Sequence, residues 1–148
     1  MKKKRVMVAE DHSITRRGLK NYLLSAYSEL EIEEARNGRE AVDRVAEALP
    51  DVIIMDMVMP RMDGASATRE IKARWPGVKI VLLLLDPGQG QSALDCGADA
   101  YLLKDGDTHE LLEVLGEMGI AALDTDDPNI LAIPGPDGSM VMNNEQGG

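Results

Sequence analysis

Short apolar runs alternate with amphipathic helical patterns along most of this chain of 148 residues. Several of the runs are almost continuously apolar, as strands covered on both faces are. The alternation predicts an α/β fold in which a parallel sheet carries helices on both faces. The expected strands lie at residues 5–9, 30–35, 51–55, 78–85 and 99–103, and the helical patterns at 13–27, 39–48, 65–74 and 108–118.

The fourth connection differs from the others. The segment from Asp86 to Cys96 begins with Asp-Pro-Gly-Gln-Gly-Gln, which contains too much Gly and Pro for a long helix. We therefore expect a short fourth helix that begins near Gln89 or later. For the last helix, we expect Asp107 to cap the start and Gly119 to mark the stop.

Four charged side chains follow the predicted strands. Glu10 and Asp11 follow the first strand, Asp56 the third and Lys104 the fifth. The carboxyl ends of parallel strands share one edge of a sheet, so these side chains should converge in one pocket. Three close carboxylates need a divalent cation such as Mg²⁺, which the backbone carbonyl of Val58 could also reach. The lysine is then free to hold a phosphoryl group, with Asp56 as the candidate nucleophile.

Three segments carry these residues: VAEDH at 8–12, DVIIMDMVMPRMDG at 51–64 and GADAYLLKD at 97–105. Together they resemble the receiver domains of two-component response regulators, over residues 4–119. The sequence around the third segment is most similar to the branch of this family that usually carries a C-terminal helix-turn-helix output domain. We expect that output domain to be absent here. The resemblance implies a flavodoxin-like fold of five βα units with strand order 2-1-3-4-5.

The resemblance also implies a role for each pocket residue. Asp56 would accept a phosphoryl group from the phosphohistidine of a sensor kinase or phosphotransfer protein. Glu10 and Asp11 would organise Mg²⁺, and Lys104 would bind a phosphoryl oxygen. The expected function is a phosphorylation-controlled binding module that acts on an unknown downstream protein.

One position departs from the family pattern. Receivers have Thr or Ser at the end of the fourth strand, where this chain reads VKIVLLLL. The position falls on Leu84 counted from Pro76, and on Leu82 counted back from Lys104; neither side chain can donate a hydrogen bond. Tyr101 stands at the aromatic switch position of the family, where we expect a half-buried ring with its hydroxyl in water. The alternative function is therefore a degenerate receiver, a partner-binding scaffold that does not switch.

An enzymatic alternative is a phosphatase of the haloacid dehalogenase type, which also uses an Asp nucleophile at a strand end. That class needs a second Asp two residues later as a general acid. Val58 occupies this place and cannot transfer protons, so we expect no turnover enzyme. An apolar side chain here should also hinder water, so we expect a slowly decaying aspartyl-phosphate.

Other side chains near the pocket have two interpretations each. Arg16 and Arg17 could meet an acidic kinase surface or could be solvated. His12 could bind a metal or could be a surface residue at a helix start. Four methionines around Asp56 are expected to fill the core rather than to bind a ligand. They are Met55, Met57, Met59 and Met62.

The charge is unevenly distributed along the sequence. Residues 105–148 carry ten acidic side chains and no Lys or Arg, and so account for the whole net charge of −10. This part should repel nucleic acid, and no recognition helix is present, so we expect no DNA binding by this chain. No apolar run approaches the roughly 20 residues of a membrane span, and the N-terminus is not a secretory signal. A cytoplasmic location and no membrane partner are expected.

These patterns divide the chain into a receiver domain at residues 1–119 and an acidic, Gly- and Pro-containing tail at 120–148. The tail is either disordered or forms a β-hairpin around PGPDG. The last helix lacks the basic residues that many receiver dimers pair across this face, and the fourth helix is short. The common receiver dimer is therefore disfavoured, and the oligomeric state is left open.

Overall fold

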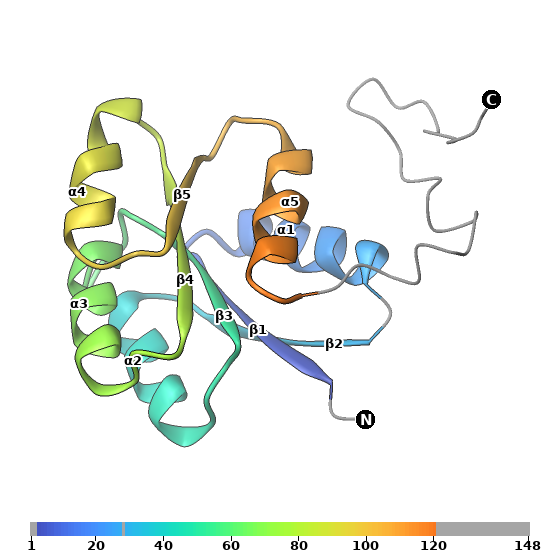
Figure 1. The fold of residues 1–148 in the computed structure, drawn as a ribbon, viewed down its shortest axis with the longest axis horizontal. Helices are drawn as coiled ribbons and strands as arrows, with labels where there is room; N and C mark the ends of the chain where they lie inside the picture. The colour runs from blue at the N-terminus through green and yellow to red at the C-terminus, as the bar shows by residue number, and fades with distance from the viewer. Residues whose placement is uncertain (1–2, 28, 121–148) are drawn as a thin grey trace.

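The structure is a computed structural model that describes residues 3–27 and 29–120. Its strands form one sheet in the order β2-β1-β3-β4-β5, and every neighbouring pair is parallel (Figure 1). The sheet confirms the predicted fold class and strand order. The strands are β1 (Lys4–Ala9), β2 (Leu30–Ala35), β3 (Val52–Asp56), β4 (Lys79–Leu84) and β5 (Ala100–Leu103).

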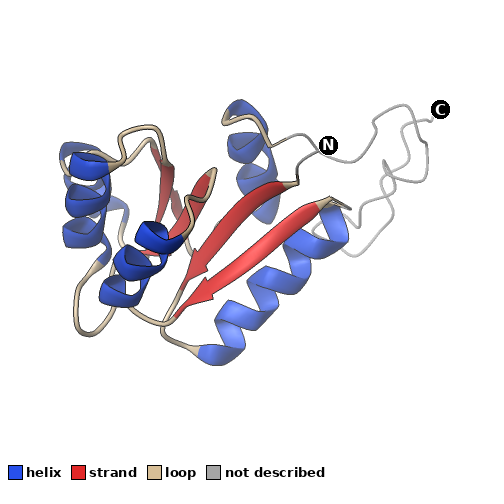
Figure 2. Cartoon of the chain, turned by 90° about the horizontal axis from the view of Figure 1, so that it is seen from below, coloured by secondary structure: helices blue, strands red, loops and turns tan. Residues whose placement is uncertain are grey.

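Helices cover both faces of the sheet. The strands are enclosed between two helical layers (Figures 1 and 2). The first face carries α1 (Ser13–Ala26) and α5 (Thr108–Glu117), and the second carries α2 (Gly38–Glu47), α3 (Gly64–Arg74) and α4 (Gly90–Asp95). The doubly wound arrangement places all five βα connections at the carboxyl edge of the sheet.

The core consists of two aliphatic layers separated by the sheet. β3 is buried along its whole length, with Ile53 and Met55 in the layer under α2, α3 and α4. Val52 and Ile54 point into the layer under α1 and α5. Each such side chain contributes about 1.5–3 kcal/mol when it is fully buried. Burial of Met55, Met57 and Met59 confirms that these methionines fill the core.

The helix boundaries follow local capping chemistry. The Asp63 side chain accepts a hydrogen bond from Ser66 N at the start of α3, and Asp107 accepts one from His109 N at the start of α5. Gly119 follows α5 with φ of 94°, a left-handed conformation that favours glycine. The predicted cap and stop of the last helix are thus confirmed.

The fourth helix is short, as the sequence predicts. A 3₁₀ turn at Pro87–Gln89 leads into α4, which has six residues and starts at Gly90. Ile120, the first residue of the expected tail, is buried against the α1 and α5 layer. Residues 121–148, including the proposed hairpin, lie outside the described residues. Within the described ranges, no helix is both long enough and apolar enough to cross a bilayer.

Candidate functional site

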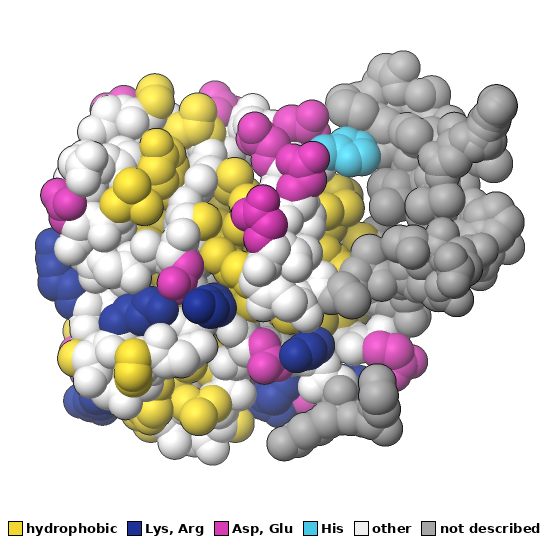
Figure 3. Space-filling model, in the orientation of Figure 1, with side chains coloured by type: hydrophobic (Ala, Val, Ile, Leu, Met, Phe, Trp, Pro, Cys, Tyr) yellow, Lys and Arg dark blue, Asp and Glu magenta, His cyan; other side chains and the backbone are white. Residues whose placement is uncertain are grey.

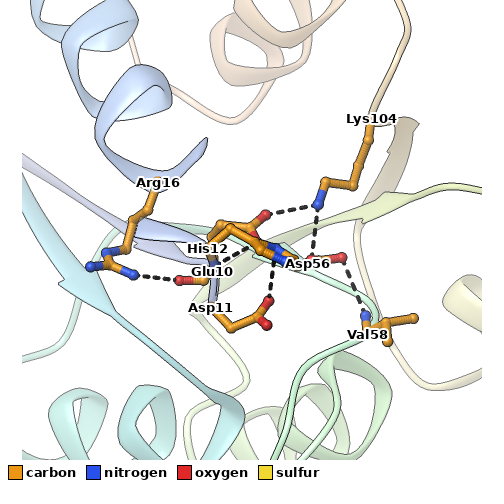
Figure 4. A network of polar contacts seen from close by, with 7 residues as sticks. All are labelled: Glu10, Asp11, His12, Arg16, Asp56, Val58 and Lys104. Atoms are coloured by element: carbon orange, nitrogen blue, oxygen red, sulfur yellow. Dashed lines mark hydrogen bonds and ion pairs between the residues drawn. The ribbon is translucent and has the colours of Figure 1, made fainter. Parts of the chain in front are cut away.

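The ammonium group of Lys104 joins two carboxylates at the carboxyl edge of the sheet. Its Nζ lies 2.9 Å from Glu10 Oε1 and 3.0 Å from Asp56 Oδ2 (Figure 4). These residues follow or end β1, β3 and β5, so the structure brings together side chains that are 46 and 48 residues apart. Glu10 and Asp56 are only 1% and 4% exposed, so both carboxylates of this charged cluster are almost completely shielded from water.

The loop between β1 and α1 adds Asp11 and His12 to the cluster. His12 Nδ1 lies 3.2 Å from Glu10 Oε2 and 3.5 Å from Asp11 Oδ1. Asp11 Oδ1 is itself buried and has no hydrogen-bond partner among the described residues. Ligand atoms of Glu10, Asp11 and His12 all lie within 4.8 Å of one another. A buried carboxylate oxygen that accepts no hydrogen bond, next to a second carboxylate, suits a hard divalent cation, which takes oxygen ligands. The donor set therefore fits Mg²⁺.

The loop after β3 is shaped around the carboxylate of Asp56. Val58 N donates to Asp56 Oδ1 over 3.2 Å, and Gly64 N donates to Met57 O over 2.8 Å. A Cβ on Gly64 would lie 2.4 Å from the carbonyl oxygen of Asp56, so only glycine lets the loop close this tightly. Val58 itself is 61% exposed.

The cluster perturbs its own protonation equilibria. Burial raises the pKa of Asp56, and the charge of Glu10 raises this pKa further, which outweighs the hydrogen bonds from Lys104 and Val58. Burial also raises the pKa of Glu10, but hydrogen bonds from Lys104 and His12 bring this pKa below its ordinary value. Burial lowers the pKa of Lys104, yet its two carboxylate partners raise this pKa overall. Lys104 is therefore a fixed cation at neutral pH.

The two candidate switch positions lie at different points along β4. Leu84 is the last residue of β4, lies beside Leu103 in the register, and accepts a hydrogen bond from Lys104 N at 2.7 Å. Leu82 lies further back, paired with Met55 and Tyr101. Leu84 is thus the strand-end residue next to the pocket. Its side chain is fully buried and apolar.

Arg16 corrects one of the sequence interpretations. Its side chain is 12% exposed and is neither solvated nor available to a kinase surface. The guanidinium donates to Glu34 Oε1 and to the carbonyl oxygen of Glu10, each at 2.8 Å. Sequence reasoning missed this contact, although Glu34 stands at the end of a predicted strand and therefore at the same edge as the pocket.

The sequence matches the family model described as "Response regulator receiver domain" over residues 6–116. Among curated proteins, it is similar to the response regulator protein VraR of Staphylococcus saprophyticus, with 33% identity over 114 residues. That match covers 75% of this chain and 54% of the relative. The chain thus spans about half the length of the curated relatives it matches.

Solved structures agree with the sequence match. A LuxR-family two-component response regulator from Aurantimonas sp. SI85-9A1 has a TM-score of 0.72 and 27% identity, covering 78% of this chain and 84% of that one. TrrA from Thermotoga maritima, in complex with Mg²⁺ and BeF, has a TM-score of 0.71, 30% identity and coverage of 78% and 98%.

A eukaryotic receiver in a complex also shares the fold. The receiver domain of Saccharomyces cerevisiae Ssk1, crystallised with the histidine phosphotransfer protein Ypd1, has a TM-score of 0.73 and 27% identity, covering 80% of this chain and 90% of that one. The family model covers well over half of the sequence, and the fold, strand order and charged edge agree with it. The chain therefore belongs to the response regulator receiver family of two-component signalling.

Proposed function

We propose that this chain accepts a phosphoryl group on Asp56 and thereby controls the binding of a partner protein. The observation that carries the proposal is the position of Lys104 Nζ, which lies within 3.0 Å of both the Glu10 and Asp56 carboxylates. A lysine held there can pair with a phosphoryl oxygen once that oxygen arrives beside Asp56. The ammonium group of Lys104 is thus already in place to offset the negative charge of an incoming phosphoryl group.

The proposed step is a displacement at phosphorus. An Oδ atom of Asp56 forms a bond to the phosphorus atom, and the bond from phosphorus to the imidazole nitrogen of a phosphohistidine breaks. The bonding electron pair leaves with the imidazole, which takes up a proton. Lys104 offsets the charge that develops on the phosphoryl oxygens, and the Val58 N–H holds the carboxylate in place.

We assign the cation to Glu10, Asp11, Asp56 and the backbone carbonyl of Val58. When bound, Mg²⁺ would offset the charge of the carboxylates and of the incoming phosphoryl group. Asp11 Oδ1, which is buried and accepts no hydrogen bond from the described residues, supports this assignment. TrrA supports it too, because that relative was crystallised with Mg²⁺ and BeF.

The proposed phosphodonor is a sensor histidine kinase or a phosphotransfer protein. The complex of the similar Ssk1 receiver with Ypd1 supports a partner of this class. We expect one phosphoryl group per chain rather than repeated hydrolysis of monoesters, because Val58 supplies no general acid two residues after Asp56.

A receiver that binds partners without switching is the second candidate. Leu84 and Leu82, the two candidates for the position of the family's hydroxyl, are both fully buried, and neither apolar side chain can donate a hydrogen bond to a phosphoryl oxygen. Tyr101 is 38% exposed, and its ring lies beside Gly90 of α4. Under this candidate, a phosphoryl mimic would leave Tyr101 and residues 86–96 unmoved.

We further propose that the common receiver dimer does not form. Acidic side chains gather over α5 on the face shown in Figure 3. The helix contains Glu110, Glu113 and Glu117 and no Lys or Arg. Two such faces would repel each other at low ionic strength.

An amide NMR titration with Mg²⁺ and then beryllofluoride tests the proposed function. We expect Mg²⁺ to shift the amides of residues 10–12 and 56–58, and beryllofluoride to shift those near Lys104 as well. The Asp56→Asn variant should show no beryllofluoride response. A folded chain that responds to neither addition would refute the proposal, and movement of Tyr101 in the unchanged chain would eliminate the non-switching candidate.

A further inference from the structure

Arg16 ties the loop that bears the acidic pair to the end of β2. It is the fourth residue of α1, and its guanidinium donates in two directions, each over 2.8 Å. Nε donates to Glu34 Oε1, and Nη1 donates to Glu10 O, the bond drawn in Figure 4. The guanidinium is planar and rigid, so two such bonds fix the relative positions of both acceptors.

The same segment is held from its other side. Glu10 N donates to Ala35 O over 3.0 Å, so the N–H of Glu10 is bonded directly to the last residue of β2. Its carbonyl is bonded to the preceding residue of that strand through Arg16. Bonds to β2 therefore hold the peptide groups on both sides of the Glu10 Cα, and the side chains of Glu10 and Asp11 branch from this held segment.

Glu34, the residue of β2 that accepts from Arg16 Nε, is ionised. Hydrogen bonds from Arg16 and Lys20 lower the pKa of Glu34, so its carboxylate is ionised at neutral pH. Lys20 Nζ lies 3.2 Å from Glu34 Oε2, whereas Arg16 uses Oε1. Lys20 thus also binds Glu34 but makes no described contact with the acidic pair.

The charge of Arg16 works against cation binding. A guanidinium next to a cation site repels Mg²⁺, so charge alone would make its removal strengthen binding. The hydrogen bond from Arg16 to Glu10 O has the opposite effect on cation binding. Without this bond the ligating carboxylates of Glu10 and Asp11 can move, so they should bind the cation less tightly. The two effects differ in sign, and a measurement of affinity separates them.

We propose that Arg16 is a positioning residue for the divalent-cation site, which orients Glu10 and Asp11 through the carbonyl of Glu10. The proposal rests on the proposed function, since it needs the acidic pair to bind the cation. Arg16 touches neither the cation nor the phosphoryl group and acts only through the loop.

The test compares Mg²⁺ affinity in the full chain and three variants by isothermal titration and amide NMR. Arg16→Ala should weaken Mg²⁺ binding about tenfold, the lower end for loss of an outer contact at a metal site. Arg16→Lys should weaken it as well, because one ammonium keeps the charge but cannot reproduce the two-directional contact. Lys20→Ala should leave the affinity unchanged, since it removes only the other partner of Glu34.

A second readout reports on position without any metal. The Asp11 amide belongs to the peptide group whose oxygen accepts from Arg16, so its resonance should shift in both Arg16 variants and not in Lys20→Ala. Thermal unfolding checks that each variant remains folded. If Arg16→Ala alone fails to fold, the milder Arg16→Lys decides the question.

The outcomes separate this proposal from the proposed function. Equal or tighter Mg²⁺ binding in the Arg16 variants, with a normal response of the unchanged chain, would overturn the positioning role alone. Failure of the unchanged chain to bind Mg²⁺ would overturn both. Equal weakening in Lys20→Ala would show that Glu34 and the helix charge matter rather than the bond to Glu10, and would also overturn the role of Arg16.

Discussion

The ring of Tyr101 lies against the first residue of α4, where Gly90 has no side chain. A Cβ on Gly90 would lie 2.6 Å from the Cζ and hydroxyl oxygen of Tyr101. Because the ring is 38% exposed, it can turn outward when this space is filled. The glycine therefore permits the observed position of the candidate switch residue.

We expect Gly90→Ala to displace the Tyr101 ring at little cost in stability. The better helix propensity of Ala, about 1 kcal/mol, should offset much of the lost contact. Ring resonances of Tyr101 and urea unfolding measure the two effects. Gly18→Ala in α1 is the control, since nothing lies within 4 Å of its added Cβ. A loss of several kcal/mol in Gly90→Ala would show that the ring cannot move.

A hydroxyl at the end of β4 should increase coupling to Tyr101. In Leu84→Thr we expect beryllofluoride with Mg²⁺ to perturb the Tyr101 ring more than it does in the unchanged chain. The substitution should cost about 2–3 kcal/mol, because it leaves a cavity and buries a hydroxyl. Leu82→Thr is the matched control, since Leu82 is equally buried but lies further back along the strand. The same ring response in all three chains would contradict this account of Leu84.

Removal of the Lys104 ammonium should leave the repulsion between the Glu10 and Asp56 carboxylates uncompensated. Lys104→Met leaves the nearly buried carboxylates of Glu10 and Asp56 without their shared cation. We expect a loss of about 3 kcal/mol in the free energy of unfolding at neutral pH without metal, as for other broken buried pairs. Added Mg²⁺ should restore part of this stability. Denaturant unfolding that shows no loss, or no recovery with Mg²⁺, would argue against the cluster.

Asp56→Asn should stabilise the metal-free protein at neutral pH. The pKa of Asp56 is raised by burial and by Glu10, so its ionised form opposes folding. This opposition is absent below 3.8, the ordinary pKa of an Asp side chain, and is fully present above the raised pKa. The gain in melting temperature should therefore be seen at pH 7 with a chelator and should vanish near the ordinary pKa. Destabilisation at pH 7 would contradict the raised pKa.

Val58 should slow hydrolysis of the phosphorylated state. Its exposed side chain stands two residues after Asp56, where a polar side chain could orient water. We expect Val58→Asn to lose its phosphoryl group about tenfold faster, which is less than the roughly 10²–10⁴-fold effect of a positioned general acid or base. Leu49→Asn is the control, because Leu49 is also exposed but precedes β3 at the opposite edge of the sheet. Equal decay in both variants would refute a role for Val58.

The sequence predicts the sheet and the charged cluster because both depend on local patterns. Apolar runs define strands, and the shared carboxyl edge follows from a parallel sheet, so Glu10, Asp56 and Lys104 could be placed together in advance. The short fourth helix follows from the glycines and proline after Asp86. These features need no knowledge of side-chain packing.

Contacts between helices and strands could not be predicted from these local patterns. The bond from Arg16 to Glu10 O depends on how α1 sits on the sheet, and an arginine near a helix start is more often solvated. The space under Tyr101 depends on the angle at which α4 approaches β5. Counting along the sequence left Leu84 and Leu82 as alternatives because the shortened connection made the two counts differ, and only the strand register shows that β4 ends at Leu84.

Phosphorylation of the full chain by a small-molecule phosphodonor, followed by intact mass spectrometry, tests the central claim most directly. With Mg²⁺ present, we expect the mass of exactly one phosphoryl group to be added to the unchanged chain and none to Asp56→Asn. A folded chain that gains no mass with Mg²⁺, or an Asp56→Asn variant that gains the same mass, would contradict Asp56 as the phosphoryl acceptor.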